Sequence, residues 1–118
     1  MASFVGIDLG TTFSAVATID DAGRPVIVPN AEGRGITPSV IYFGQDPPLV
    51  GEEAKNMAPL GEGQIAAFFK RDMGDPNFRL EFNGKRYSAE DLSAILLASL
   101  KGQAEASLAG QVREAVIT

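Results

Sequence analysis

A glycine and two threonines follow a carboxylate near the start of the chain. One apolar run ends at Asp8 and a second begins at Phe13, which is typical of two strands joined by a tight turn. Because Gly10 permits backbone angles that are closed to other residues, its N–H and those of Thr11 and Thr12 can converge on one point and form an anion site. The two threonine hydroxyls add donors, so the turn predicts a phosphate site.

The carboxylate of Asp8 beside a phosphate indicates a cation between the two groups. Hydrated Mg²⁺ keeps several waters and meets protein carboxylates around nucleotide phosphates, so we expect Asp8 to hold Mg²⁺ through water. A plain hairpin with a polar turn accounts for the same residues without any ligand. These residues alone leave both interpretations open.

Composition limits the classes of function. The chain has 118 residues, of which 45% are hydrophobic and 21% charged, as in one globular domain or a piece of one. A formal net charge of -5 argues against nucleic-acid and anionic-membrane partners, which select basic patches. The absence of cysteine and histidine removes disulfides, thiolate metal sites and the commonest general base. No leader pattern or apolar stretch of membrane-spanning length is present, so we expect a cytoplasmic protein.

Apolar alternation and turn residues predict a three-stranded antiparallel meander at the start of the chain. Its strands are expected over residues 3–9, 13–20 and 24–28. The residue before Pro38 is pushed away from helical space, so an extended segment is expected over residues 37–43.

The middle of the chain predicts short elements. Residues 51–57 are expected to form about two helical turns, whereas residues 65–71 fit either a short strand or a helical turn. Asn83-Gly84 predicts a hairpin between strands over residues 78–82 and 85–87, because this pair supplies the two positive φ angles of a type I′ turn.

A long helix and a last strand are expected next. Residues 88–91 form a variant of the capping box with Ser88 as N-cap, and apolar residues recur at helical spacing up to Ala109, where Gly110 supplies the stop. A strand over residues 112–118 is expected to lie parallel to an earlier strand after a right-handed crossover. This strand pattern runs to the last residue without a turn, so we expect the chain to be part of a longer protein.

Several blocks of the sequence resemble one family. Residues 6–12, which read Gly-Ile-Asp-Leu-Gly-Thr-Thr, look like the first phosphate-binding signature of the 70-kDa heat-shock chaperones of the DnaK type. Further blocks follow in the family's order and at about its spacing, at residues 30–33, 37–39, 50–55, 69–71 and 114–118. Each block alone is weak, but together they cover nearly the whole chain.

The resemblance implies an α/β fold of the ribonuclease-H-like actin and hexokinase type, whose two lobes enclose ATP. This chain would be part of the first lobe, with the meander and a parallel strand after a crossover helix. Residues 1–38 and 111–118 would form its base subdomain, and residues 39–110 an inserted smaller α+β subdomain. The rest of the ATPase domain and the substrate-binding domain would lie outside this chain. We therefore expect the chain alone neither to hydrolyse ATP nor to bind it tightly.

The resemblance also implies the roles of individual residues. Asp8 would hold hydrated Mg²⁺ and K⁺, and Lys70 would point at the γ-phosphate and orient the attacking water. The phosphates of ATP or ADP would be bound by the N–H groups and hydroxyls of Gly10, Thr11, Thr12 and Phe13. Phosphoryl transfer depends mostly on positioning and charge neutralisation, so a lysine and a metal-linked carboxylate suffice without histidine. Without the resemblance, Lys70 would be an ordinary solvated lysine.

The resemblance further implies that the complete protein couples ATP binding and hydrolysis to binding and release of unfolded polypeptides during stress. Its partners would be a J-domain co-chaperone and a nucleotide-exchange factor.

Two positions depart from the family pattern. Gly35 stands where the family usually has an arginine, and Asp72 stands where it usually has an apolar residue.

Two alternatives remain beside the chaperone interpretation. A sugar or acetate kinase of the same superfamily would also begin with a glycine–threonine hairpin beside an aspartate. A small interaction module without enzymatic activity is the other alternative.

Overall fold

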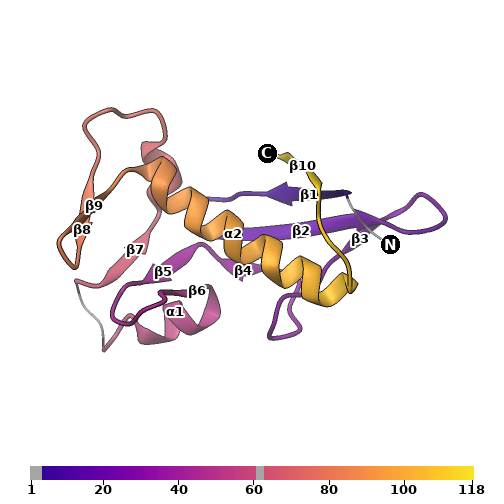
Figure 1. Cartoon of the computed structure of the whole chain (residues 1–118), viewed down its shortest axis with the longest axis horizontal. Coiled ribbons are helices and arrows are strands. Elements are labelled where there is room, and N and C mark those ends of the chain that lie inside the picture. Colours follow the sequence, from indigo (N-terminus) through magenta and orange to yellow (C-terminus); the bar gives the residue numbers. More distant parts are fainter. Residues whose placement is uncertain (1–3, 61–62) are drawn as a thin grey trace.

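A sheet with the strand order β10-β1-β2-β3 forms the base of the protein, in a computed structural model that describes residues 4–60 and 63–118 (Figure 1). Its strands are β1 (Phe4–Asp8), β2 (Phe13–Ile19), β3 (Pro25–Ile27) and β10 (Glu114–Ile117). The predicted antiparallel meander is confirmed, although Ser3 lies outside the described residues. β10 pairs with β1 in parallel, with Ile7 beside Ile117, so the predicted parallel last strand is confirmed as well.

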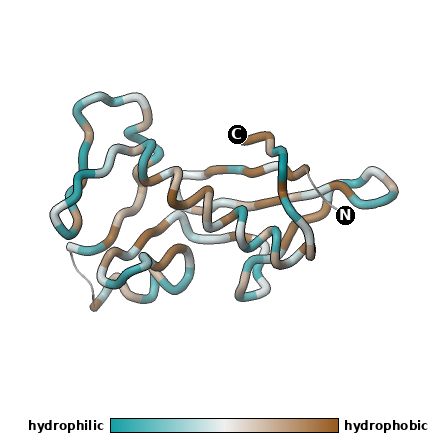
Figure 2. Tube along the Cα trace, in the orientation of Figure 1, coloured by the Kyte–Doolittle hydropathy of each residue, from teal (hydrophilic) through white to brown (hydrophobic). Residues whose placement is uncertain are grey.

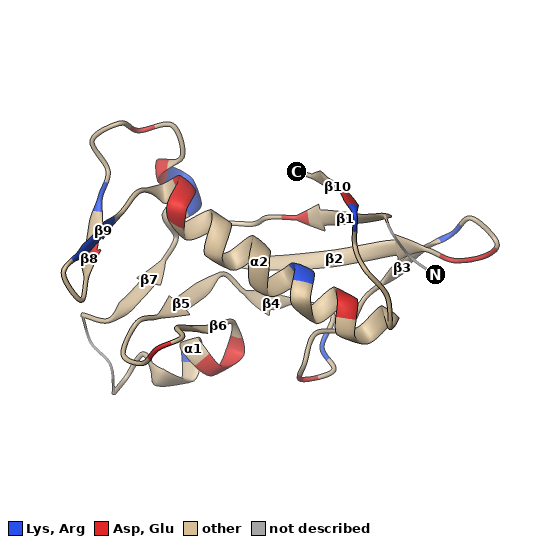
Figure 3. Cartoon of the chain, in the orientation of Figure 1, with Lys and Arg blue, Asp and Glu red and all other residues tan. Residues whose placement is uncertain are grey.

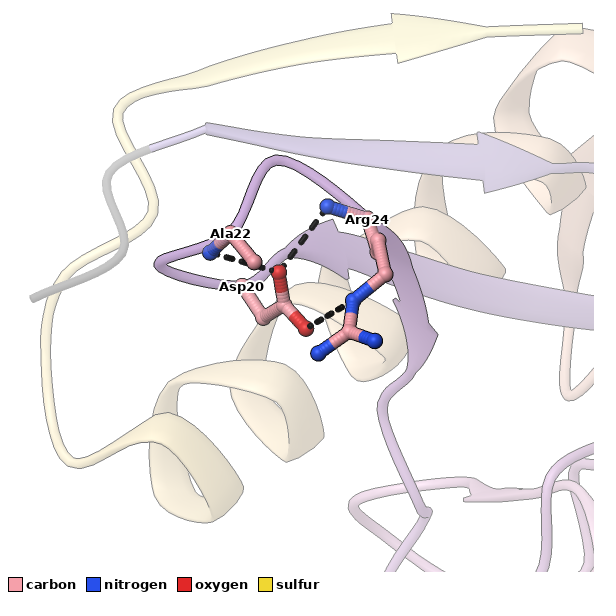
Figure 4. A network of polar contacts seen from close by, with 3 residues as sticks. All are labelled: Asp20, Ala22 and Arg24. Atoms are coloured by element: carbon pink, nitrogen blue, oxygen red, sulfur yellow. Dashed lines mark hydrogen bonds and ion pairs between the residues drawn. The ribbon is translucent and has the colours of Figure 1, made fainter.

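The turn between β2 and β3 is closed by the side chain of Asp20 (Figure 4). Its Oδ1 accepts hydrogen bonds of 2.9 Å from the backbone N–H groups of Ala22 and Arg24. The Nε atom of Arg24 lies 3.4 Å from Oδ2, but its side chain is 77% exposed, so the ion pair adds little stability. The turn is therefore held by these two side-chain contacts together with backbone hydrogen bonds from Asp20 N–H to Arg24 and from Gly23 N–H to Asp20.

A smaller three-stranded sheet lies beside the base, with β5 (Val40–Tyr42) between β6 (Leu49–Val50) and β7 (Ile65–Ala67). The short strand β4 (Thr37–Pro38) pairs with β2, and the helix α1 (Glu52–Met57) follows β6. The predicted extended segment and short helix are both confirmed.

Residues 65–71 contain both of the structures that their sequence allows. The strand β7 ends at Ala67, and a 3-10 helix, η1 (Phe69–Asp72), follows at once. Phe68 between them has φ of 60°, so its left-handed backbone ends the strand and begins the helical turn.

The hairpin of β8 (Leu80–Phe82) and β9 (Lys85–Tyr87) is confirmed. Asn83 and Gly84 have φ angles of 53° and 81°, as a type I′ turn requires. The Nδ2 atom of Asn83 also donates a 2.9 Å hydrogen bond to the carbonyl of Phe43, so the turn residue attaches the hairpin to the segment after β5.

One long helix, α2 (Ala89–Leu108), crosses the molecule from the β8–β9 hairpin to the base sheet (Figure 1). Its capping box is confirmed, because the N–H of Asp91 donates to Ser88 Oγ at 3.0 Å and the N–H of Ser88 donates to Asp91 Oδ2 at 2.9 Å. Its end differs from the prediction: Ala109, not Gly110, has the left-handed conformation, with φ of 53°. Glu105 Oε2 then accepts a 2.9 Å bond from the N–H of Val112, which guides the chain toward β10.

A single hydrophobic core joins the two sheets through α2. Leu92, Leu96 and Leu100 lie along the buried face of the helix. The same core cluster contains Ile7 of the base sheet and Ile41 of the smaller sheet. Figure 2 shows hydrophobic stretches along the strands and hydrophilic residues in the connecting turns. The proposed division into a base and an inserted subdomain stays a prediction.

Candidate functional site

Residues 9–12 connect β1 to β2 and contain the predicted phosphate site. Asp8 is exposed at the end of β1, whereas Leu9 is buried. The chain turns so tightly here that a Cβ atom at Gly10 would collide with the carbonyl oxygen of Phe13. The requirement for glycine at this position therefore comes from the close approach of the backbone.

Two buried serines hold the turn from within. The N–H of Gly10 donates to Ser14 Oγ at 3.3 Å, and Ser39 Oγ donates to the carbonyl of Gly10 at 2.9 Å. The two hydroxyl oxygens lie 2.9 Å apart, and the serines are 1% and 2% exposed. The N–H of Gly10 is thus engaged within the protein. Within residues 4–60 and 63–118, the N–H groups of Thr11 and Thr12 have no hydrogen-bond partner.

The carboxylate of Asp8 suits a hydrated cation. Among the residues that the structure describes, no group of three or more Asp, Glu, His or Cys side chains is arranged to hold a metal ion. One exposed carboxylate beside two threonines cannot replace the water shell of an ion, but it can accept hydrogen bonds from that shell, as Mg²⁺ favours. The residues therefore fit Mg²⁺ bound through water, and the assignments of Mg²⁺ and K⁺ to Asp8 stay predictions.

Lys70 lies in η1 and is partly buried. The N-cap of η1, Phe68, lines a hollow of about 290 Å³ that Thr11, Thr12 and Phe13 also line. The structure thus brings the residue before η1 and residues 10–12, which we call the glycine–threonine turn, to one hollow. Lys70 itself is not part of its lining, and its role at a phosphate stays a prediction.

Lys55 also lines this hollow, although the sequence did not predict it as a site residue. Among the described residues it is the only charged one in the lining, and its Nζ atom lies 5.5 Å from the centre of the Phe13 ring. In Figure 3 the acidic residues are spread over the loops, both helices and the strands, and one of them, Asp8, lies at the end of β1. The described lining of the hollow is therefore largely apolar with one cation, in a chain whose net charge is negative.

Ser14 and Ser39 were also missed as site residues. Ser14 shares the side of its predicted strand with Val16, and Ser39 directly follows Pro38. A hydroxyl on the buried side of a strand must find a hydrogen-bond partner, so the alternation pattern gave a signal for Ser14. Its partner Ser39 lies 25 residues further along the chain, and only the pairing of β2 with β4 brings the two together.

Among the described residues, none of the helices combines the length and the apolar character that crossing a membrane requires.

Comparison with known proteins identifies the family. A family model described as Hsp70 protein matches residues 4–79 and residues 67–118. The two matches overlap and together extend over nearly the whole chain, including β1, the glycine–threonine turn, η1 and β10. The mixed α/β structure is compatible with the ATPase domain of this family. The chain therefore belongs to the Hsp70 family.

Proposed function

We propose that this chain forms one wall of the ATP site of an Hsp70-type molecular chaperone. The observation that carries the proposal is the turn between β1 and β2, where the N–H groups of Thr11 and Thr12 have no partner among the described residues. They follow the exposed Asp8 by three and four residues along the chain. Backbone donors beside a carboxylate suit a phosphate chain that carries a divalent cation.

Each predicted site residue has a role in this proposal. Thr11, Thr12 and Phe13 bind the β- and γ-phosphates through N–H groups and hydroxyls, and Gly10 gives the turn its shape. Asp8 holds the water shell of Mg²⁺ and, with it, K⁺. When bound, Mg²⁺ neutralises charge on the phosphates. Lys70 orients the attacking water at the γ-phosphate, which requires η1 to present its amine toward the hollow that the turn also lines.

The wider function follows from the family. We infer a ribonuclease-H-like first lobe of the actin and hexokinase type, in which residues 1–38 and 111–118 form the base subdomain and residues 39–110 the inserted one. The complete protein would couple ATP hydrolysis to binding and release of unfolded polypeptides in the cytoplasm under stress. Its partners would include a J-domain co-chaperone and a nucleotide-exchange factor. Family membership supports this inference, whereas the sugar or acetate kinase and the interaction module have no comparable support.

Nuclear magnetic resonance tests the proposed site directly. We expect Mg·ATP to shift the ¹H–¹⁵N signals of Thr11 and Thr12 in the ¹⁵N-labelled chain, with a dissociation constant of about 1 mM or weaker, because one wall gives few contacts. Signals of the β8–β9 hairpin serve as an internal control. Unmoved Thr11 and Thr12 signals at saturating Mg·ATP contradict the phosphate site. Micromolar affinity by calorimetry contradicts the single-wall proposal instead.

A further inference from the structure

The hydrogen bonds of Ser39 determine where the donors of the glycine–threonine turn point. Its Oγ atom donates to the carbonyl of Gly10 and its N–H donates to the carbonyl of Thr12, both at 2.9 Å. One residue of the β4–β5 segment thus holds two carbonyl groups of the turn. Both carbonyls therefore face Ser39.

Peptide geometry converts these contacts into a direction for the N–H groups. The carbonyl of Gly10 and the N–H of Thr11 belong to one peptide unit, and in a trans peptide the two groups point in opposite directions. Among the described residues the one cis peptide is Asp46–Pro47, so the Gly10–Thr11 unit is trans. Because the carbonyl of Gly10 points toward Ser39, the N–H of Thr11 points away from Ser39. The carbonyl of Thr12 also points toward Ser39, so the N–H of Phe13, in the same peptide unit, points away from it as well.

Ser14 completes the arrangement and fixes the hydroxyl protons. Ser39 has one hydroxyl proton, which it gives to Gly10, so the hydroxyl of Ser14 must donate to Ser39 Oγ. Ser14 Oγ in turn accepts the N–H of Gly10. The result is a closed ring in which both hydroxyls donate once and accept once, and both polar ends of Gly10 are held. Both serines are almost fully buried, so water cannot replace either member without rearrangement.

We infer that Ser39 and Ser14 are positioning residues of the phosphate site: through Gly10 and Thr12 they aim the N–H groups of Thr11 and Phe13 outward. This inference rests on the proposed function. The serines touch no phosphate themselves, and their effect is to set the direction of donors before the ligand arrives. A preset direction matters because donors that must reorient on binding contribute less to affinity.

Three variants of the chain separate positioning from general stability. Ser39→Ala and Ser14→Ala each remove one member of the ring. Ser93→Ala is the matched control. Ser93 lies in α2 and is also buried, at 3% exposure, but its hydroxyl contacts Met73 Sδ, at 3.4 Å, and not the turn. Mg·ATP titration followed by NMR gives the dissociation constant, and amide exchange of Gly10 without nucleotide reports on the ring itself.

We expect Ser39→Ala to weaken Mg·ATP binding roughly fivefold to tenfold, as for loss of one buried hydrogen-bond partner, while Ser93→Ala binds like the unmodified chain. Exchange of the Gly10 amide should accelerate about tenfold in Ser14→Ala and stay unchanged in Ser93→Ala. The Ser14→Ala/Ser39→Ala double variant should lose less affinity than the two single losses combined, since the hydroxyls act together.

Different results overturn different statements. If Ser39→Ala and Ser14→Ala bind Mg·ATP as tightly as the unmodified chain, the positioning role is wrong and the proposed phosphate site stands. The role is equally wrong if Ser93→Ala weakens binding as much as Ser39→Ala. If Mg·ATP moves no turn signal in the unmodified chain, the proposed function fails and the positioning role with it. Should Ser39→Ala not fold, Ser14→Ala alone decides between these outcomes.

Discussion

At the scale of single residues, Gly10 is the position where the backbone leaves no room for a side chain. A Cβ atom there would meet the carbonyl oxygen of Phe13, whereas a Cβ atom at Gly6 would meet nothing within 4 Å. We expect Gly10→Ala to lower the free energy of unfolding by about 1–3 kcal/mol, and Gly6→Ala to change it by less than about 0.5 kcal/mol. Urea unfolding of both variants measures the difference, and equal values would show that the turn can relax.

Lys70 provides the second prediction at this scale. In the complete ATPase domain we expect Lys70→Ala to leave nucleotide binding largely intact and to slow hydrolysis about 100-fold, because the proposed role places its charge at the transferred phosphoryl group. Lys101→Ala, which removes an exposed lysine of α2, is the control. Single-turnover hydrolysis gives the rate. An unchanged rate would remove Lys70 from the mechanism.

At the scale of elements, the start of α2 gives the chain a pH-dependent contribution to stability. Hydrogen bonds from the backbone and then the side chain of Ser88 lower the pKa of Asp91 below its ordinary value of 3.8, and Arg79 adds a smaller effect in the same direction. A lowered folded-state pKa means that the stabilisation is present above pH 3.8 and is lost as the pH falls through the folded-state value.

We therefore expect the unmodified chain to lose its stability advantage over Asp91→Asn as the pH falls below 3.8. Urea unfolding followed by circular dichroism from neutral pH to about pH 2 measures this difference. Asp21→Asn, in the exposed turn after β2, is the control. An advantage that persists in acid would show that the carboxylate does not cap the helix.

The other end of α2 offers a stabilising substitution. Ala109 has a left-handed backbone, which glycine adopts without strain. We expect Ala109→Gly to raise the free energy of unfolding by up to about 1 kcal/mol, whereas Ala98→Gly inside the helix should lower it by about 1 kcal/mol. The midpoint of thermal unfolding separates the two. A lower midpoint for Ala109→Gly would show that chain entropy outweighs the relief of strain.

Elements with local signals were predictable from the sequence, and contacts between distant elements were not. Asn83-Gly84 carries its own turn geometry, and Ser88 its own cap, so both were found from a few neighbouring residues. The end of α2 was misplaced by one residue: Ala109 has the left-handed backbone expected of glycine, and Glu105 holds the N–H of Val112 beyond it, a contact that no local pattern predicts. The ring of Ser14 and Ser39 depends on strand pairing across 25 residues, for which no local pattern exists.

At the scale of the whole molecule, one core extends through both sheets, so the chain should unfold as a unit. Leu96 of α2 is fully buried in this core. We expect Leu96→Ala to lower the free energy of unfolding by about 2–5 kcal/mol. Tyrosine fluorescence reports on Tyr42 and Tyr87, outside the base sheet, while circular dichroism reports on the whole chain. The two transitions should coincide and shift together. Leu60→Ala, at an 82% exposed position, is the control. Separate transitions would show that the two sheets unfold independently.

The pairing of β10 with β1 has a consequence for how the protein is made. The N–H of Thr118 donates to the carbonyl of Ile7, and the carbonyl of Thr118 accepts from the N–H of Leu9, both at 2.9 Å. The residue that leads into the glycine–threonine turn is thus secured by a residue synthesised more than a hundred positions later. Contacts of such sequence separation form late and slowly. Thr118 must therefore leave the ribosomal exit tunnel before the nascent chain can form the hydrogen bonds that hold Leu9, the residue before the glycine–threonine turn.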